Sequence, residues 1–244
     1  MSAPASRTLP RTRAEELASA PFTLALSAGF FGFYAHVGLL LALEEAGLRP
    51  ARVVGSSAGA LAGGTWAAGV GAAALADELA RLRRSDFWDP GLPWRGGLLR
   101  GRGFAALLNR ILAATGVERI EDCSLPFACV GTTLFGRRLA LERGRLESAI
   151  RASCAVPLLF EPVLHEGRRL VDGGLVDGPG ATLLAGGERA LFHDLQGSRI
   201  AAGAGRFVLR VDGLPKVGPY ALERGAEALE QVRGAARAWL AAQA

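Results

Sequence analysis

The residues that could do chemistry begin with a serine set between glycines, Gly55-Ser56-Ser57-Ala58-Gly59. This G-x-S-x-G spacing is typical of a sharp turn from a strand into a helix, where glycines avoid Cβ clashes and the central hydroxyl stands clear of the backbone. Backbone N–H groups at the start of the helix then face the place where a negatively charged oxygen would form. The pattern predicts a nucleophile at Ser57, although a small-residue turn that only packs a helix on a strand has the same signature.

A serine hydroxyl is a weak nucleophile until a base takes its proton, and two side chains are candidates for that base. Asp172 ends an expected strand and precedes Gly173 and Gly174, so its carboxylate can project at the carboxyl edge of a sheet, where ligands collect in open α/β folds. A plain Asp-Gly turn looks the same. His193 completes the order serine, acid, histidine of an α/β-hydrolase triad, but it lies inside an expected strand, and only two strand candidates precede the serine. The aspartate is therefore the favoured base.

Several segments around the serine predict the elements that position it. Apolar runs at residues 22–26 and 52–54 are typical of buried strands, and residues 37–46 and 60–67 have helical composition. With the loop over 27–32, the order is strand, loop, helix, strand, turn, helix, which is typical of a parallel sheet with helices on its faces. Further helices are expected at 72–84, 104–114, 146–151 and 220–242, and strands at 127–132, 139–141, 169–171 and 206–211.

Length and composition agree with one large α/β domain. The chain has 244 residues, enough for a sizeable core but too few for two domains of this class. Half of the residues are hydrophobic and 21% are charged, which excludes an intrinsically disordered protein. The 33 glycines have no Gly-X-Y period, which excludes a collagen-like chain.

Three blocks that contain the serine and the aspartate resemble the patatin-like phospholipase family, as found in bacteria. The blocks are Gly55-Ser56-Ser57-Ala58-Gly59, Ser153-x-Ala155-x-Pro157-x-x-Phe160-x-Pro162 and Asp172-Gly173-Gly174. Residues 35–47 are similar to the first helix of the family and residues 97–100 to its mid-domain segment, so the resemblance covers roughly residues 22 to 180 in family order. It implies a three-layer α/β/α domain with a largely parallel sheet. It also implies a Ser57–Asp172 dyad without histidine that cleaves fatty acyl esters of lipids.

The loop that supplies oxyanion-binding amides in this family is altered here. The family has Gly-Gly-Gly-x-Arg-Gly, whereas this chain has Ser27-Ala28-Gly29-Phe30-Phe31-Gly32, with fewer glycines and no arginine. Backbone amides do not depend on side-chain identity, so oxyanion and substrate binding is still expected at Gly29, Phe30, Gly32 and Ala58. The altered loop leaves a second interpretation open, a weakly active or non-catalytic patatin-like protein that binds lipids or other proteins.

The segment 85–103 differs in composition from its surroundings, with five glycines, two prolines and two tryptophans. Tryptophans beside arginines suit an anionic lipid–water interface, so peripheral contact with a membrane surface is expected here. A solvated loop with two partly buried tryptophans is the alternative. The residues concerned are Trp88, Trp94, Arg95, Arg100 and Arg102.

A stretch without Asp, Glu, Lys or Arg, residues 17–43, is long enough to cross a membrane. Proline and glycines interrupt it, so a buried strand, turn and helix are expected instead. The N-terminal arginines are followed by Glu15 and Glu16 where the apolar part of a secretory signal should start. We therefore expect a cytoplasmic protein in three parts, a flexible tail at 1–20, a patatin-like catalytic domain at 21–215, and an amphipathic helix at 216–244 packed on the domain or extending it.

Net charge and cysteine content limit the kinds of partner and cofactor that we expect. The formal net charge is +5, and Lys216 is the only lysine among 28 basic residues; the arginines form no aromatic-basic motif, so no nucleic-acid partner is expected. The glycine-rich run 53–64 imitates a phosphate loop but lacks the Gly-Lys-Ser/Thr that would bind a nucleotide. Three cysteines without C-x-x-C or Cys/His metal-ligand spacing argue against a disulfide framework and a zinc site and indicate a reducing compartment. No metal or other cofactor is expected. A lipid or ester substrate is the expected partner.

Overall fold

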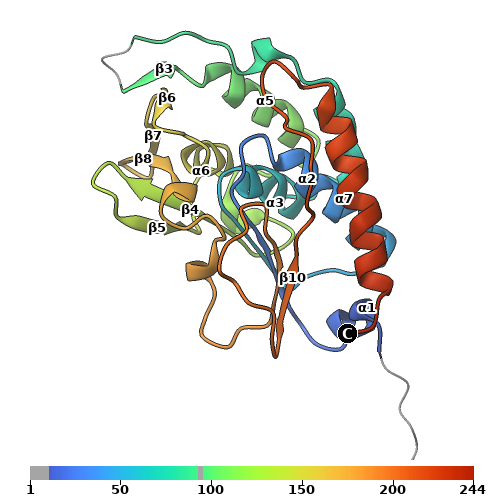
Figure 1. Ribbon diagram of the computed structural model, residues 1–244. Helices are drawn as coiled ribbons and strands as arrows, with labels where there is room; N and C mark the ends of the chain where they lie inside the picture. Colours follow the sequence, from blue (N-terminus) through green and yellow to red (C-terminus); the bar gives the residue numbers. More distant parts are fainter. Residues whose placement is uncertain (1–10, 93–95) are drawn as a thin grey trace, which may run out of the picture.

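A computed structural model describes residues 11–92 and 96–244 of the chain. It is a mixed α/β fold with a central, mostly parallel sheet flanked by helices, which confirms the fold class (Figure 1). The helices are α1 (Arg13–Ala18), α2 (Phe33–Glu45), α3 (Ala58–Ala67), α4 (Ala72–Ala80), α5 (Arg102–Leu112), α6 (Leu146–Ser153) and α7 (Arg224–Ala241). The strands are β1 (Thr23–Leu26), β2 (Arg52–Gly55), β3 (Gly97–Leu99), β4 (Phe127–Thr133), β5 (Arg138–Leu141), β6 (Leu158–Phe160), β7 (Val163–His165), β8 (Arg168–Asp172), β9 (Ala190–His193) and β10 (Arg206–Leu209).

The register of three neighbouring strands brings the serine turn and Asp172 to one level. The sheet order is β10-β9-β1-β2-β4-β8-β7, with β5 paired to β4, and β10 through β4 run parallel while β5, β7 and β8 are antiparallel to their neighbours. Gly55 at the end of β2 pairs with Cys129 of β4, and Asp172 at the end of β8 pairs with Gly131. Two residues of strand span about 6.6 Å, so Asp172 lies at the level that the chain reaches two residues beyond Gly55.

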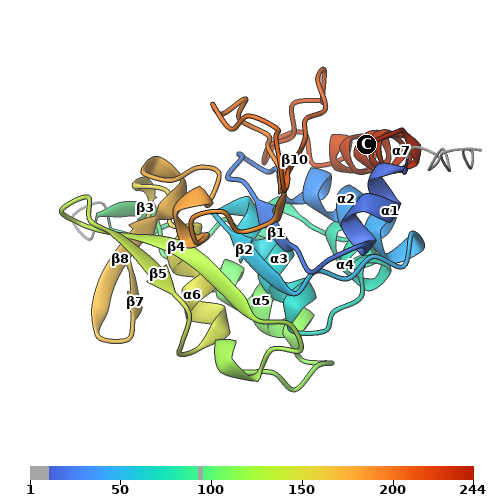
Figure 2. The same ribbon diagram turned by 90° about the horizontal axis from the view of Figure 1, so that it is seen from below.

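The two faces of the sheet are covered differently. Side chains such as Leu24, Leu26 and Val53 point to one face and join the core that contains the buried residues of all seven helices. Alternate residues such as Ala25 and Val54 point to the other face, where mostly smaller side chains meet the 3₁₀ turn η5 (Ala181–Leu183) and neighbouring loops. Figure 2 shows the segment after β8 on the side of the sheet opposite α3 and α5. The α-helical layer is therefore thick on one face, and a 3₁₀ turn with loops forms the layer on the other.

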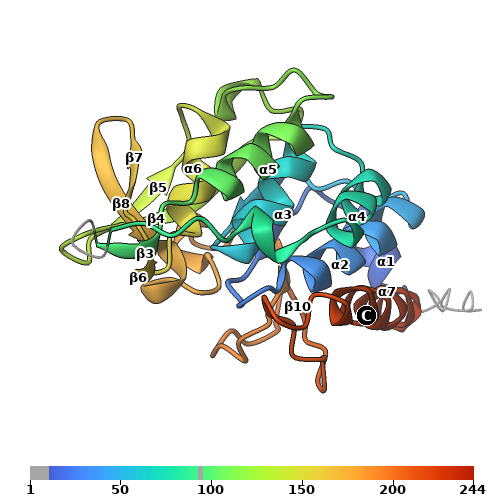
Figure 3. The same cartoon turned by 90° about the horizontal axis from the view of Figure 1, so that it is seen from above.

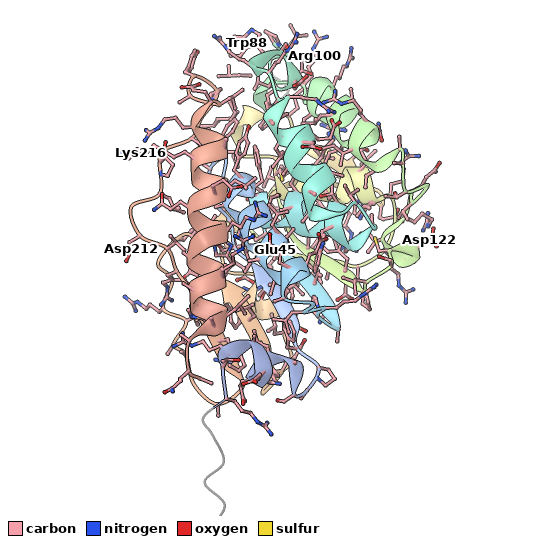
Figure 4. The ribbon with its side chains drawn as sticks, turned by 90° about the vertical axis from the view of Figure 1, so that its right-hand side faces the viewer. Glu45, Trp88, Arg100, Asp122, Asp212 and Lys216 are labelled. Atoms are coloured by element: carbon pink, nitrogen blue, oxygen red, sulfur yellow. The ribbon has the colours of Figure 1, made fainter. Side chains whose placement is uncertain are left out.

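Helix α7 packs along α2 and closes the helical layer. Contacts run from α7 to α2, from α2 to α3 and α4, and from α3 to α6, so these helices lie side by side over the sheet (Figure 3). Gly38 of α2 allows the closest approach, because a Cβ there would overlap the carbonyl oxygen of Leu229. At the end of α2, Glu45 accepts hydrogen bonds from Arg233 and Arg237 of α7 (Figure 4). The C-terminal helix is thus part of the helical layer, while the proposed three-part division of the chain stays a prediction.

The charge-free stretch at residues 17–43 forms the end of α1, strand β1, a loop and most of α2, as the interruptions in its sequence predicted. Leu17, Leu24 and Leu40 in it are fully buried in the core. Within residues 11–92 and 96–244, no helix has both the length and the apolar composition that a membrane crossing needs.

Three short strands were not predicted. β3, β6 and β7 have three residues each, which is too short for an alternating pattern to stand out. β3 pairs with β6 in a separate two-stranded sheet, so residues 97–99 are a strand rather than loop. Helix α2 also begins four residues earlier than expected, because Phe33 and Tyr34 are buried against the core and extend its apolar surface.

Replacement of Gly38 by alanine tests the close contact of α2 with α7. The added methyl group overlaps backbone, so Gly38→Ala should lower the free energy of unfolding by about 1–3 kcal/mol. Gly234→Ala, on α7 with no atom within 4 Å of the added Cβ, is the matched control. It should raise the free energy of unfolding by about 0.5–1 kcal/mol through helix propensity. Urea unfolding followed by circular dichroism measures both, and equal effects would contradict the close contact.

Candidate active site

Ser57 lies at the turn between β2 and α3 in a conformation that few residues adopt. Its backbone has φ of 50° and ψ of −116°, outside the regions that a non-glycine residue prefers. The glycines on either side permit this turn. A Cβ at Gly55 would lie 2.5 Å from the oxygen of Gly59, and a Cβ at Gly59 would overlap the oxygen of Leu26. The two motif glycines therefore let α3 begin directly against β1 and β2.

Two residues at the end of α6 hold the backbone of Ser57. Its N–H donates to Ser153 Oγ at 3.0 Å, and its carbonyl oxygen accepts from Cys154 Sγ at 3.1 Å. Ser153 is fully buried, so its hydroxyl is shielded from bulk solvent. These bonds satisfy both polar backbone groups of a strained residue. Neither role could be predicted from local sequence, in which the only signal is the place of Ser153 at the head of a family block.

The hydroxyl of Ser57 and the carboxylate of Asp172 are in direct contact. Ser57 Oγ donates to Asp172 Oδ2 at 2.7 Å, and the N–H of Gly174 donates to Asp172 Oδ1 at 2.6 Å. Gly173 is required because a Cβ there would overlap the oxygen of Val130. Asp172 is 4% exposed, and this burial raises the pKa of its carboxyl from 3.8 to about 6, while the two hydrogen bonds act in the opposite direction. The carboxylate is thus a stronger base than an exposed aspartate and is still ionised at neutral pH.

The three histidines make hydrogen bonds away from this pair. His36 Nδ1 lies 2.9 Å from His193 Nδ1, and His36 Nε2 lies 2.8 Å from the carbonyl oxygen of Ser27. A carbonyl only accepts, so His36 donates from Nε2 and accepts at Nδ1 from His193. Burial lowers the pKa of His36 to about 4 and that of His193 well below its usual value, so both are neutral. His165 bonds Ser148 and the oxygen of Arg143.

The loop at residues 27–32 offers some free amides next to Ser57, though fewer than its sequence suggested. The N–H of Gly32 is occupied, because it donates to the oxygen of Gly29 at 2.9 Å and closes a turn. Leu195 packs under this turn, and a Cβ at Gly32 would lie 2.5 Å from its Cδ1. In the described part of the chain, no hydrogen bond engages the N–H groups of Gly29, Phe30 or Ala58. The expectation of an oxyanion amide at Gly32 is therefore corrected to a role in closing the turn.

An apolar cavity of about 810 Å³, including its open mouth, begins at Ser57. Gly29, Phe30 and Ala58 line it beside the serine, which brings four of the predicted site residues together. Most of its wall is aromatic or aliphatic. Further lining residues are Phe31, Phe33, Leu61, Phe87, Trp88, Leu99, Phe104, Val156, Leu159, Phe160 and Tyr220. Trp88 is half exposed at this cavity, whereas Trp94 and Arg95 of the expected interfacial segment lie outside the described residues.

The strained serine turn, its carboxylate partner and the mostly parallel sheet define a site of the nucleophile-elbow type. A family model for patatin-like phospholipases matches residues 24–185, and the chain belongs to this family. Among curated relatives, an uncharacterized NTE family protein of Mycobacterium bovis is 36% identical over 162 residues, 63% of this chain and 42% of that protein. The lysophospholipase NTE1 of Mycosarcoma maydis is 33% identical over 190 residues, 73% of this chain and 10% of that protein.

Solved structures with the same fold are distant in sequence. VipD from Legionella pneumophila matches 90% of this chain and 66% of its own, with a TM-score of 0.56 and 13% identity. The ExoU–SpcU complex from the type III secretion system of Pseudomonas aeruginosa matches 90% of this chain and 51% of that chain, with a TM-score of 0.52 and 17% identity. These two likenesses concern the fold. The chain spans less than half the length of the curated relatives described above.

The burial of the Asp172 carboxylate should lower the free energy of unfolding at neutral pH. Because its pKa is about 6 in the folded chain and 3.8 when exposed, the folded state binds a proton between these pH values that the unfolded state does not. The contribution of this carboxyl group to the free energy of unfolding therefore falls as the pH rises from about 4 through 6. Asp172→Asn removes the charge and should raise the free energy of unfolding at pH 8 by at most about 3 kcal/mol.

Thermal unfolding at two pH values measures this effect. At pH 8 the melting temperature of Asp172→Asn should exceed that of the wild type. Near pH 3.5 the wild-type carboxyl is largely protonated in both states, so most of the difference should vanish. A difference of equal size at both pH values would mean that buried charge is not its cause.

Proposed function

We propose that this protein is a serine acyl hydrolase that cleaves fatty acyl esters of lipids through a Ser57–Asp172 dyad. The observation that carries the proposal is the 2.7 Å hydrogen bond from Ser57 Oγ to Asp172 Oδ2 at the end of an apolar cavity. Family membership supports the reaction class, and a relative named as a lysophospholipase supports lipids as the substrate class.

In the proposed first step, Ser57 Oγ attacks the carbonyl carbon of the ester as its proton passes to Asp172 Oδ2. The tetrahedral intermediate collapses, the ester C–O bond breaks, and Asp172 returns the proton to the leaving alcohol or lysolipid. Water then gives a proton to Asp172 and attacks the acyl-enzyme, which releases the fatty acid and restores the Ser57 hydroxyl. A pKa of about 6 allows the carboxyl group both to accept and to return the proton near neutral pH.

The free amides supply the electrostatic part of this proposal. Negative charge on the former carbonyl oxygen would accept hydrogen bonds from the N–H of Ala58, at the start of α3, and from Gly29 or Phe30. The turn closed by Gly32 and Leu195 fixes the direction of this loop before substrate arrives. The loop therefore remains suited to binding an oxyanion although it has lost two of the glycines usual in the family.

The cavity would hold the acyl chain, and its rim suits a lipid surface. Almost all of its lining side chains are apolar, as expected for a site that holds an acyl chain. Phe30, Trp88 and Tyr220 line it and are 65%, 53% and 76% exposed, so apolar rings surround the entrance. Large exposed apolar groups around a pocket are typical of contact with a membrane or another apolar surface. Peripheral membrane contact is therefore part of the proposal.

Covalent labelling tests the nucleophile. A fluorophosphonate probe should label the wild type and fail on Ser57→Ala, and hydrolysis of p-nitrophenyl esters and phospholipids should fall by roughly 10³-fold or more in Ser57→Ala and Asp172→Asn. Ser56→Ala is the matched control, because the Ser56 hydroxyl is buried without a hydrogen-bond partner among the described residues and should be dispensable. A wild type that is neither labelled nor active would instead support the non-catalytic interpretation.

The pH profile tests the base. Only the ionised form of Asp172 can accept the proton, so kcat/KM should rise about tenfold per pH unit up to about pH 6 and level off above it. His36, with a pKa of about 4, stays neutral in most of this range and does not disturb the loop. A midpoint near 3.8, the value of an exposed aspartate, would contradict the role of burial.

A further inference from the structure

One charged side chain lines the cavity among the described residues, that of Arg84. Arg84 begins the 3₁₀ turn η1 (Arg84–Asp86), between α4 and the segment that carries Trp88. Figure 1 shows η1 at the end of the molecule where the chain enters α7, and Figure 4 shows Trp88 at the same end beside Arg100. The arginine therefore stands at the mouth of a pocket whose other end is Ser57.

Two aromatic rings hold the guanidinium of Arg84. Its Cζ lies 4.6 Å from the ring centroid of Trp88 and 4.4 Å from that of Tyr220, both within cation–π range. Trp88 and Tyr220 come from segments more than 130 residues apart, so the tertiary fold brings them together. These contacts use no hydrogen-bond acceptor, and no hydrogen bond from the Arg84 side chain occurs among the described residues, so its N–H groups are available to donate to a ligand.

No carboxylate of the described residues is paired with Arg84. All eleven ion pairs in residues 11–92 and 96–244 involve other basic residues. The segments outside that description, residues 1–10 and 93–95, contain no Asp or Glu in their sequence. An arginine that is held in place by rings, lines a cavity and lacks an acidic partner is suited to bind an anion of the ligand.

We infer that Arg84, held by Trp88 and Tyr220, binds the phosphate of the lipid substrate at the cavity mouth and makes phosphate-bearing esters the preferred substrates. The inference rests on the proposed function, because it takes the acyl chain to occupy the cavity and the ester to reach Ser57. A planar guanidinium donates two parallel hydrogen bonds to a phosphate, which fixes the headgroup as well as attracting it. The two rings also exclude a competing cation, since Arg84 already occupies their faces.

Two substrates with the same acyl chain and the same ester bond separate this role from general activity. The measured quantity is the ratio of kcat/KM for 1-oleoyl lysophosphatidic acid to kcat/KM for 1-oleoylglycerol, both in neutral detergent micelles. Arg84→Gln should lower this ratio by about 10- to 100-fold, as expected for a hydrogen bond to a charged group. Arg84→Lys, which keeps the charge but not the planar fork, should lower it less.

Arg83→Gln is the matched control, because it removes the same charge from the neighbouring residue, which is exposed and does not line the cavity. Its ratio should stay within about twofold of the wild type. Equal losses in Arg83→Gln and Arg84→Gln would overturn the specific site and leave only general attraction of an anion. An unchanged ratio in Arg84→Gln, with both esters still hydrolysed, would overturn the inference while the proposed function stands.

Binding to the inactive variant Ser57→Ala keeps the two proposals distinguishable. Calorimetry should detect 1-oleoyl lysophosphatidic acid at lower concentration than 1-oleoylglycerol, and a second change, Arg84→Gln, should remove that difference. If this binding difference is found but the wild type hydrolyses neither ester, the proposed hydrolase function is refuted and the phosphate site at Arg84 is supported. Inorganic phosphate is the third ligand in this binding experiment. If it bound as tightly as the lysolipid, the site would be specific for free phosphate rather than for a lipid headgroup, and the inference would fail.

Discussion

The site depends on one hydrogen bond, from the hydroxyl of Ser57 to the carboxylate of Asp172. These residues are 115 positions apart, and the bond forms because β2 and β8 both end beside β4 at nearly the same level. Close backbone contacts fix that level. Gly59 brings α3 onto β1, and Gly173 brings the turn after β8 onto β4. Any side chain at either glycine would push the serine or the aspartate away from the other, so the geometry of the pair depends on these two glycines.

A second constraint is how the fold accommodates buried titratable side chains. Asp172 is buried with two hydrogen-bond donors but no cation among its hydrogen-bond partners, so its ionised form is only partly stabilised. Histidines do not compensate for this charge, because burial keeps His36 and His193 neutral and they bond to each other rather than to Asp172. Their hydrogen bonds support the loop at residues 27–32 through the carbonyl of Ser27. The interior thus supports the loop with neutral groups and leaves the one buried carboxylate of the site basic.

Local signals in the sequence predicted the turn at Ser57, the strand ending at Asp172 and most of the longer helices and strands. Those features depend on glycine spacing and apolar periodicity, which can be read within a few residues. The availability of the Gly32 amide could not be predicted, because Leu195, more than 160 positions away, packs under the turn that uses it. The bonds from Ser153 and Cys154 to Ser57, and the contact of Arg84 with Tyr220, likewise arise only when distant segments meet.

Most of the wall of the cavity comes from parts of the chain other than those that fix Ser57 and Asp172. Its aromatic and aliphatic residues belong mainly to the loop before α2 and the start of α2, to the segment after η1, to β3, α5 and β6, and to the turn before α7, and α3 adds Leu61. The dyad is fixed instead by β2, β4, β8 and the end of α6. Substitutions in most of the wall can therefore lengthen, narrow or reshape the cavity while Ser57 and Asp172 keep their geometry. On this scaffold the shape of the pocket can therefore change by gradual substitution while the turn at Ser57 and the position of Asp172 stay the same.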